Sequence, residues 1–434
     1  MFGLDEVYKN VRREEYTTGM ITEAGRQRKE LVILNYQYWI PTFLKTILYY
    51  AVTVYDKVYF LYPVAGTEKQ IHSHRGRIFF IGIPRKNAFR YIVKLPIYFT
   101  GKDTREQLKL AIRHKLPLMK FLESVAVYNT WADVLEKAVS GLFKRDLIRK
   151  ENTVVMAAWF SAEAGAGARI KMKYPEVRFV SLAHSYEVDR KKNPYAEYDC
   201  NGMIHHYCDH IYFISELLMK QYYGNACIKK SSVMHLGIRK LYPERRVPGS
   251  ADGSIRLLSC SDMGPVKRID RIIDALGSWE GSNIEWTHFG EGPLLEEMKK
   301  RAEQVLGNKH NVRFRFMGQV KNRVIHEYYN TQTVDLFVNV SEAEGLPISL
   351  MECMSYGVPA IVTKAGGNTE LVTESAGFLL DVDFSDEELC GAIKSYIEMD
   401  HKEQEKMRTS AYERWKEYFD ASVNIVRLLR EMRG

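Results

Sequence analysis

The sequence has few cysteines and no cysteine framework. Six cysteines are scattered over 434 residues without the spacing of a disulfide scaffold or a zinc site. This absence argues against a small disulfide-stabilised fold and predicts free thiols in a reducing compartment. No apolar run is long enough to cross a membrane, and residues 1–6 lack the pattern of a secretory signal. We therefore expect a cytoplasmic chain.

A nucleic-acid-binding motif is also absent, although the formal net charge is +8. Residues 1–235 hold 36 Lys or Arg against 23 Asp or Glu, whereas the remainder holds 26 against 31. A basic first half indicates either an anionic surface or substrate for that half, or simply a soluble basic domain. Because no recognised motif accompanies the charge, nucleic acid is not expected as a partner.

The chain does contain enough apolar material for two domains. With 46% hydrophobic residues over 434 positions, it is too long for a single core. Strand and helix patterns alternate almost from end to end, which predicts parallel sheets with helices on both faces. Residues 240–254 are rich in Pro, Gly and charge and lack periodicity, which predicts a linker. The expected domains are 1–239 and 240–411, followed by an amphipathic helix over 412–434.

The strand pattern recurs seven times in the first domain and six times in the second, with a mostly helical insertion around residues 105–148. The expected strands are Leu31–Tyr36, Lys57–Tyr62, Arg77–Ile83, Thr153–Trp159, Val177–Ala183, His210–Ser215 and Ser232–Leu236, then Ser254–Cys260, Ile284–Phe289, Val312–Met317, Val334–Val340, Pro359–Thr363 and Gly377–Leu380.

The most informative segment, Ser341–Ala360, carries two glutamates eight positions apart, Glu344 and Glu352. An apolar, β-branched stretch precedes it, and residues 348–356 have the composition of a helix that begins near Pro347. Such a helix presents its free N–H groups and the positive end of its dipole at the carboxyl ends of the strands. Open α/β sheets bind ligands at this edge, and a phosphate is stabilised there.

This segment resembles the signature of retaining glycosyltransferases with the GT-B fold, in the glycogen-synthase-like group called family four. The family has Glu-Gly, a second Glu eight positions after the first, and then Gly-x-Pro. Here Glu344-Gly345, Glu352 and Gly357–Pro359 match, and the resemblance extends in order over residues 254–380. It implies an α/β chain of two Rossmann-like domains whose parallel sheets face each other across a cleft. It also implies that the helix over 412–434 crosses back onto the first domain, which the sequence itself does not show.

The resemblance also implies a metal-independent donor site in the second domain, with no cofactor. Glu344 would contact the donor sugar near its reacting face, and Glu352 would accept hydrogen bonds from the ribose hydroxyls. The backbone N–H groups near Gly345 and Leu346 would hold the distal phosphate. Lys267 stands where the family has its donor-phosphate lysine.

One position departs from the family pattern. Five residues before its phosphate lysine the family frequently has an arginine, and here that residue is Asp262. Arg268 is the substitute candidate for the second positive charge; the alternative for it is a solvated helix start. Gly290 and Gln319 lie in turns that surround the nucleotide base and ribose in the family, so they are expected to contact the donor.

In the first domain, residues 180–189 follow an expected strand and resemble the family's histidine-bearing loop. The resemblance implies that His184 donates to a sugar hydroxyl or orients the acceptor, whereas a lone histidine after a strand is otherwise structural. The aromatic segment Tyr36–Tyr50 lacks the paired glycines that the family often has there. It is either an ordinary buried helix or a cradle for a lipid-linked or polymeric acceptor.

Three patterns imitate other sites. Residues 164–168 suggest a dinucleotide fingerprint, but Ile170 stands where its third glycine belongs, so we reject it. The cysteines and histidines between residues 200 and 210 match no zinc spacing. Residues 381–383 resemble the acidic triplet of the other major glycosyltransferase fold, but they follow the last expected strand, where they begin a loop.

Together these features predict a retaining glycosyltransferase of cell-surface polysaccharide assembly that uses a UDP- or GDP-linked sugar. The expected acceptor is a glycan or a polyprenyl-linked glycan, with an anionic inner membrane face as a further partner. The alternative is a catalytically silent GT-B subunit that partners another glycosyltransferase. A phosphorylase of the same fold would need a pyridoxal phosphate lysine in a context that the sequence does not offer.

Overall fold

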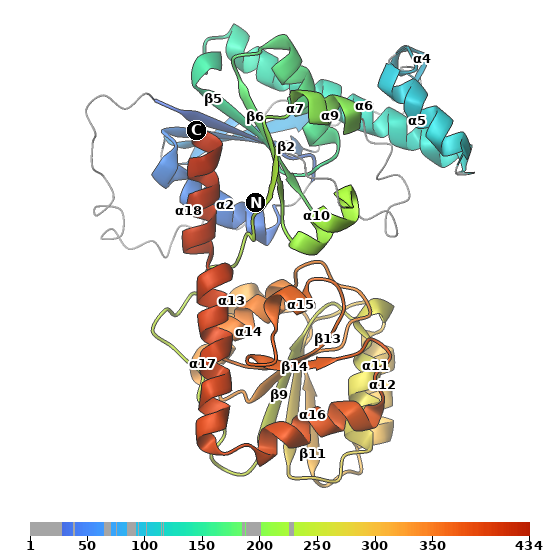
Figure 1. Ribbon diagram of the computed structural model, residues 1–434, viewed down its shortest axis with the longest axis vertical. Helices are drawn as coiled ribbons and strands as arrows, with labels where there is room; N and C mark the ends of the chain where they lie inside the picture. The colour runs from blue at the N-terminus through green and yellow to red at the C-terminus, as the bar shows by residue number, and fades with distance from the viewer. Residues whose placement is uncertain are drawn as a thin grey trace. The chain divides into compact units, whose positions relative to one another are not determined.

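The computed structural model describes residues 28–37, 40–64, 71–74, 76–84, 93, 95–100, 102–113, 115, 117–184, 187, 201–224 and 230–434. Contacts divide the chain into two compact units (Figure 1). Unit 1 comprises the chain up to His235 together with the C-terminal segment Ser422–Gly434, and unit 2 comprises Leu236–Ala421. Each unit is a sheet covered by helices, so each has a core of its own.

Unit 1 is built on a sheet that has eight strands within the described residues, in the order β3-β4-β2-β1-β5-β6-β7-β8. Neighbours pair in parallel, except that β3 runs antiparallel to β4 at the edge. The sequence predicted each of these strands except β3, because its residues, Ile-His-Ser-His, include a single apolar side chain and so give no apolar strand pattern. The strands are β1 (Glu30–Leu34), β2 (Lys57–Val64), β3 (Ile71–His74), β4 (Ile78–Pro84), β5 (Thr153–Ala157), β6 (Arg178–Ala183), β7 (His210–Phe213) and β8 (Ser231–Val233).

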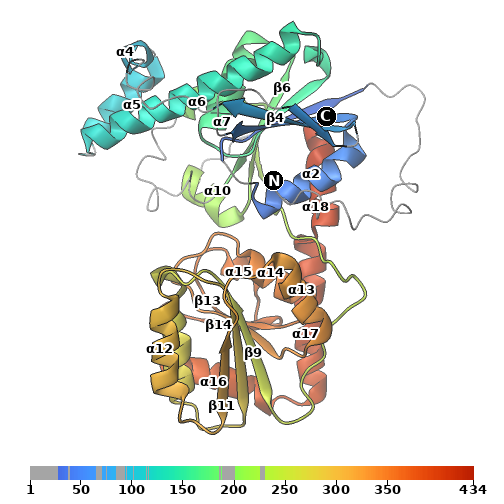
Figure 2. The same cartoon turned by 180° about the vertical axis from the view of Figure 1, so that it is seen from behind.

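Two helices of unit 1, α6 and α7, lie against each other (Figure 2). The glycines of the rejected fingerprint are in α7, where they permit close packing: an ideal Cβ at Gly165 would lie 2.5 Å from the Tyr128 hydroxyl oxygen. The described helices of this unit are α2 (Thr42–Val54), α4 (Leu95–Tyr98), α5 (Lys102–Arg113), α6 (Leu118–Lys144), η2 (Lys150–Asn152), α7 (Ala162–Lys173), α9 (Asn201–Tyr207), α10 (Glu216–Tyr223) and α18 (Ala421–Arg433).

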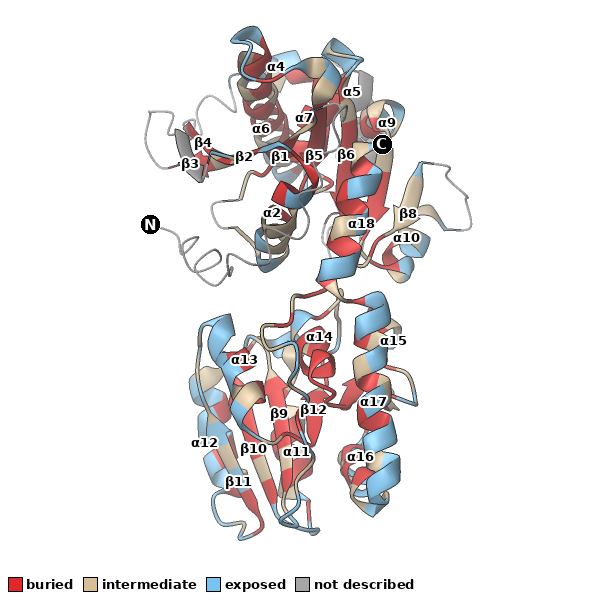
Figure 3. Cartoon of the chain, turned by 90° about the vertical axis from the view of Figure 1, so that its left-hand side faces the viewer, coloured by how far each residue is buried: buried red, intermediate tan, exposed pale blue. Residues whose placement is uncertain are grey.

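Unit 2 has a sheet of six strands, all parallel, in the order β11-β10-β9-β12-β13-β14. Alternate residues of one strand enter opposite cores: Leu257 packs on one face and Leu258 on the other. Buried residues therefore predominate in the strands β9, β10, β12 and β13 (Figure 3). The strands are β9 (Ile255–Cys260), β10 (Ile284–Phe289), β11 (Val312–Phe316), β12 (Leu336–Asn339), β13 (Ala360–Thr363) and β14 (Gly377–Leu380).

The helices of unit 2 cover both faces of this sheet. The segment expected to form a helix over residues 348–356 does so, and Gly357 follows it with a φ of +74°. The helices are η3 (Pro265–Lys267), α11 (Ile269–Gly277), α12 (Leu295–Leu306), α13 (Asn322–Thr331), α14 (Ile348–Ser355), α15 (Asn368–Leu371), α16 (Asp386–Glu398) and α17 (His401–Tyr418).

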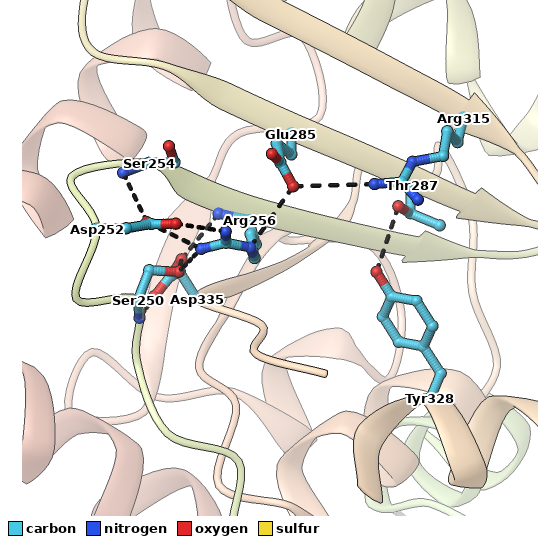
Figure 4. A network of polar contacts seen from close by, with 9 residues as sticks. All are labelled: Ser250, Asp252, Ser254, Arg256, Glu285, Thr287, Arg315, Tyr328 and Asp335. Carbon is cyan, nitrogen blue, oxygen red and sulfur yellow. Dashed lines mark hydrogen bonds and ion pairs between the residues drawn. The ribbon is translucent and has the colours of Figure 1, made fainter. Parts of the chain in front are cut away.

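Residues 240–254, the expected linker, are held by hydrogen bonds at the amino-terminal edge of the unit 2 sheet. Asp335 accepts hydrogen bonds from the backbone N–H of Ser250 and of Arg256, each at 2.8 Å (Figure 4). The buried guanidinium of Arg408, on α17, donates to the carbonyl oxygen of Val247 at 2.6 Å. These contacts occupy the amino-terminal edge, and the carboxyl edge of the sheet remains for the candidate site.

The C-terminal segment, expected as one helix over residues 412–434, is broken. The N–H of Ile238 donates to the carbonyl of Phe419 at 3.0 Å, and its carbonyl accepts from Ala421 N at 3.1 Å. This strand-like bridge interrupts the helical hydrogen bonds between α17 and α18. In unit 1, the Tyr55 hydroxyl donates to a carbonyl of α18 at 3.1 Å. Among the described residues, no helix is both long and apolar enough to cross a membrane.

Replacing Gly167 in α7 by alanine should destabilise unit 1. An ideal Cβ there would lie 2.0 Å from the ring of Phe179, so α7 or β6 has to shift, which typically costs about 1–3 kcal/mol. Gly141 in α6 is the matched control because nothing lies within 4 Å of its Cβ position. Alanine there should stabilise the helix by roughly 0.5–1 kcal/mol. Urea unfolding followed by circular dichroism measures both effects, and equal effects would contradict this packing.

Candidate functional site

The adjacent carboxyl ends of β9 and β12 bring a lysine to a glutamate in unit 2. Lys267 is the last residue of η3, which follows β9. Glu344 lies in the loop after β12, and its Oε1 accepts a hydrogen bond from Lys267 Nζ at 2.8 Å. The same oxygen accepts from Ser341 Oγ at 2.6 Å and from Asn339 Nδ2 at 3.3 Å. Three donors on one oxygen fix the orientation of a carboxylate whose side chain is 8% exposed.

The loop that carries Glu344 is pressed against a glycine turn. Gly366 and Gly367 follow β13, and an ideal Cβ at either would lie 1.9 Å from the carbonyl oxygen of Glu344 or Gly345, respectively. Gly367 N–H also donates to the Gly345 carbonyl at 2.9 Å. Gly366 has a φ of +55°, which glycine adopts without steric cost. Contact between the two backbones therefore sets the orientation of the loop.

Arg268 binds backbone carbonyls, not the Lys267–Glu344 pair. Its guanidinium donates to Val340 O at 2.8 Å and to Val382 O at 2.6 Å. Arg268 thus joins the end of β12 to the loop after β14. These two hydrogen bonds give the donor nitrogens a structural role. The assignment of Arg268 as a second phosphate-binding cation therefore stays a prediction. Asp262, at the position of the family's arginine, is exposed.

Glu352 lies in α14 and is 3% exposed. Its Oε1 accepts a hydrogen bond from Asn322 Nδ2 at 2.6 Å, and His326 Nε2 is 3.7 Å from the same oxygen. Burial raises the pKa of Glu352 to about 7, although the Asn322 hydrogen bond acts to lower it. A buried carboxyl group resists ionisation because the interior solvates charge poorly. Any hydroxyl donor that reached Glu352 would stabilise its charged form.

His326 is held neutral beside Glu352. Burial lowers the pKa of His326 to about 4, with smaller contributions from the charges of Arg239 and Lys240. Its Nδ1 lies 2.8 Å from the hydroxyl oxygen of Tyr356. A tyrosine that donates to Nδ1 leaves the proton of the neutral ring on Nε2, on the side of Glu352. At neutral pH this contact is one between a dipole and a carboxyl group, not an ion pair.

Gly290 and Gln319 follow β10 and β11 at the same carboxyl edge. Gly290 has a φ of +139°, and an ideal Cβ there would lie 1.7 Å from the carbonyl oxygen of Ser261. The close approach that Gly290 permits is therefore to the chain's own turn after β9. Gln319 is exposed. Contact of either residue with a nucleotide stays a prediction.

In unit 1, His184 lies at the carboxyl end of β6 between two aromatic rings. Its ring centroid is 4.6 Å from that of Phe43 and 4.7 Å from that of Trp159. His184 Nε2 lies 3.1 Å from the carbonyl oxygen of Ala158, and since a carbonyl only accepts, Nε2 carries the proton. Burial lowers the pKa of His184 to about 4, although this hydrogen bond raises it. In this tautomer Nδ1 accepts, so a hydroxyl would donate to it, opposite to the direction expected from the resemblance.

Two buried glutamates that the sequence did not single out tie together the loops around His184. Glu187 accepts from the backbone N–H of His184 at 3.1 Å and of Phe160 at 3.3 Å. Glu163 accepts from the backbone N–H of Tyr36 at 3.0 Å. Burial raises the pKa of Glu163 well above its usual value, against the lowering effect of the Tyr36 hydrogen bond. The carboxyl ends of β1, β5 and β6 are thus joined through two carboxyl groups.

The histidines and cysteines between residues 200 and 210 make local hydrogen bonds. Cys208 Sγ donates to the carbonyl of His210 at 3.1 Å, and His205 and His210 each pair with a neighbouring hydroxyl group. In the part of the chain that the structure describes, no group of three His, Cys, Asp or Glu side chains is placed to hold a metal ion. Cys200 lies outside the described residues.

Sequence reasoning found Lys267, Glu344 and Glu352 but missed their polar partners. Asn339 had a usable signal, because it is a polar residue at the carboxyl end of a buried strand. Asn322 and His326 had a weaker one: they lie four residues apart, on one face of α13. Neither signal predicts that Asn322 and His326 face a carboxyl group on α14.

Residues 243–414 match the family model described as glycosyl transferases group 1. Among characterised relatives, the chain is similar to the O-antigen biosynthesis glycosyltransferase WbnH of Escherichia coli. The two are 25% identical over 244 residues, which cover 55% of this chain and 67% of the relative. This similarity therefore extends beyond the matched family segment.

The fold is similar to that of solved glycosyltransferases. The apo form of the lipopolysaccharide outer core galactosyltransferase WaaB superposes with a TM-score of 0.62 at 14% identity, over 93% of this chain and 98% of that one. HepE of Anabaena, solved in complex with UDP and glucose, gives a TM-score of 0.61 at 14% identity, over 93% and 99%. These likenesses confirm the predicted fold class, an α/β chain of two Rossmann-like units of the GT-B type.

Glu352→Gln should stabilise the protein at pH 8 and much less at pH 5. A folded-state pKa of about 7 against 4.5 means that the folded chain holds the proton longer than the unfolded chain. The stability that this provides at low pH is lost as the pH rises from 4.5 through 7. A neutral glutamine avoids that loss, so we expect a gain of about 3 kcal/mol at pH 8 and under about 1 kcal/mol at pH 5.

Urea unfolding at the two pH values measures this difference. Glu327→Gln is the control, because Glu327 is an exposed glutamate on α13 and its replacement should change neither value. An effect of Glu352→Gln that is the same at pH 5 and pH 8 would contradict the burial argument.

Proposed function

We propose, from the match of residues 243–414 to the glycosyl transferases group 1 family model, that this chain transfers a sugar from a UDP- or GDP-linked donor to a glycan or polyprenyl-linked glycan. Transfer proceeds with retention of configuration and without a metal ion or other cofactor. The O-antigen biosynthesis relative supports a role in cell-surface polysaccharide assembly. The neighbour solved with UDP and glucose supports a nucleotide-sugar donor.

The Lys267–Glu344 ion pair is the observation that carries this proposal. An ammonium group has three N–H donors, and Lys267 uses one of them on Glu344. The others are available to the diphosphate, whose negative charge grows as it leaves. Within the described chain, the N–H groups of Gly345 and Leu346 take part in no backbone–backbone hydrogen bond. They lie just before α14, where the helix dipole favours an anion.

The two glutamates have different tasks in this mechanism. Glu344 is a positioning group that holds the ammonium of Lys267 and contacts the donor sugar; it is not a nucleophile. Glu352 accepts hydrogen bonds from the ribose hydroxyls, and these bonds offset the cost of its buried charge. The leaving phosphate takes the acceptor proton on the face that it vacates, so the sugar keeps its configuration. Proton NMR of the product tests this, and an inverted product would rule it out.

His184 is the acceptor-side group in unit 1. Its neutral ring offers the Nδ1 lone pair to a hydroxyl, while Nε2–H is held by Ala158. Glu187 fixes the backbone of His184 through a hydrogen bond at 3.1 Å. Because the pKa of His184 is lowered to about 4, the ring keeps this accepting form throughout the neutral range.

A thermal-shift screen against UDP, GDP, ADP and their common sugars should find one nucleotide that raises the melting temperature, with or without a chelator. A ligand that binds only the folded state stabilises it by about 2.7 kcal/mol at a hundred times its Kd. Glu352→Gln should keep the fold and lose most of that shift. If no nucleotide acts, or if the shift needs a metal, the donor site is wrong and a silent subunit that partners another glycosyltransferase becomes the better account.

Lys267→Ala should lower the rate of nucleotide release from the donor by roughly 10²–10³-fold, the usual cost of removing one group that stabilises a growing negative charge. Glu344→Ala should lose at least as much, because it also frees the ammonium from its position. Lys364→Ala is the control: Lys364 follows β13 and pairs with Asp381 at 2.6 Å, but its side chain is 51% exposed. Its rate should stay at the wild-type value. A Lys267→Ala protein as fast as the wild type would refute the site.

A further inference from the structure

A helical arm of unit 1, made of the described residues between 93 and 120, exposes several large apolar side chains. It comprises α4, α5 and the first residues of α6, and Figures 1 and 2 show α4 and α5 at the end of α6 that lies away from the sheet. Soluble chains usually scatter exposed apolar residues singly, so five large ones within this short stretch of chain mark a candidate interaction surface. The exposed fractions are 60% for Val93, 65% for Ile97, 66% for Ile112, 53% for Leu118 and 77% for Met119.

The arm has its own small core, so these exposed residues are surplus to its folding. Tyr98, Ala111, Phe121 and Val125 form a buried cluster separate from the main core of unit 1. The hydroxyl of Tyr98 donates to Asp133 Oδ2 at 3.1 Å, which ties α4 to α6. The inward-facing apolar residues therefore complete the packing, and the outward-facing ones are left for a partner.

The arm is also strongly basic. Residues 93–120 contain seven Lys or Arg against two Asp or Glu, a balance of +5 in a chain whose net charge is +8. On α5, Arg105, Lys109 and Ile112 are exposed and follow a spacing of four and three residues, so they share one helix face. A face that combines cations with an aliphatic side chain suits the headgroup region of an anionic bilayer.

We propose that residues 93–120 dock unit 1 on the surface of an anionic lipid bilayer. The exposed apolar side chains enter the boundary between headgroups and acyl chains, and the exposed basic ones, Arg105, Lys109, Lys115 and Lys120, face the phosphates. A protein partner fits less well, because lysine is depleted from the cores of protein interfaces. This docking deepens the proposed function, because a polyprenyl-linked acceptor is presented at such a surface. It rests on the proposed function only for this biological role, and not for the binding itself.

Flotation of the full-length chain with phosphatidylcholine vesicles, with and without phosphatidylglycerol, tests the docking in the absence of donor and acceptor. We expect binding to the anionic vesicles at low salt, release as the salt concentration rises, and no binding to phosphatidylcholine alone. Failure to float with anionic vesicles at low salt would overturn the proposal.

Two independent pairs of substitutions locate the surface. Arg105→Glu with Lys120→Glu should lower the vesicle partition coefficient by more than about tenfold, since each cation near an anionic surface contributes about fivefold. Ile112→Ser with Met119→Ser should act in the same direction by removing the inserted side chains. If the apolar pair lowers the melting temperature, the charge pair decides, because its side chains are exposed.

The opposite end of α6 provides matched controls. Its 27 residues place its two ends about 40 Å apart. Lys144→Glu with Arg145→Glu changes the charge by the same amount there, and Leu147→Ser with Met172→Ser removes side chains that are 46% and 53% exposed. Both control pairs should float as the wild type does. Arm variants that float as well as the wild type would overturn the proposal. The proposal would also be overturned if the arm variants changed only the oligomeric state, from dimer to monomer in light scattering. A second copy of the chain, not a bilayer, would then bind the arm.

The thermal shift by the donor nucleotide, measured in solution on the same variants, separates this proposal from the proposed function. We expect every arm variant to keep the wild-type shift. Lost flotation with a normal shift in the wild type would strike only the docking. Normal flotation without any nucleotide shift would strike the donor site and leave the docking standing.

Discussion

Burial on both faces restricts the polar chemistry of the central strands of unit 2 mainly to the strand ends. Leu257 and Leu258, successive residues of β9, enter opposite cores. The charged residues of β9 and β10 lie next to the amino-terminal start of their strands, where Arg256 and Glu285 pair at 3.5 Å. The amino-terminal edge is occupied by Asp335 and Arg408, which fix the incoming chain and α17. The carboxyl edge is the place where loops can present charge, and Lys267 and Glu344 lie there.

At that edge, partial burial makes each charged group depend on its partner. The side chains of Lys267 and Glu344 are 20% and 8% exposed, so either one without the other would be a poorly solvated charge. Among the described residues, Glu352 contacts Asn322 and the neutral ring of His326 but no cation, and burial raises its pKa to about 7. The unliganded site therefore carries a local cost in stability, of the kind that binding groups often impose and that a hydrogen-bonding ligand removes.

Sequence patterns predicted those parts of the structure that short stretches of chain determine. The strand, loop, helix and glycine of Ser341–Ala360 follow from apolar runs and from residues with special backbone preferences, and the structure places them as expected. The edge strand β3 was missed because Ile71 is its single apolar residue, so it lacks an apolar strand pattern. The position of Arg268 was predicted, but its partners were not, since the carbonyl of Val382 lies 114 residues further along the chain.

The same distance in sequence explains the glutamates that were missed in unit 1. Glu163 binds the backbone of Tyr36 across 127 residues, and no local pattern encodes that pairing. The carboxyl groups of the two units differ in the kind of hydrogen-bond donor that each one faces. Glu187 accepts from backbone N–H groups, and Glu163 accepts from the backbone of Tyr36 and more distantly, at 3.3 Å, from the hydroxyl of Ser161, so both hold loops in place.

Glu344 instead accepts from an ammonium group and from two side chains. Side-chain donors can turn toward an incoming phosphate or sugar, whereas backbone donors are fixed by the strands that carry them. The kind of donor that faces a buried carboxyl group thus separates a structural role from a binding role. By this criterion Glu344 is the carboxylate with adjustable donors, and the glutamates of unit 1 position the backbone around His184.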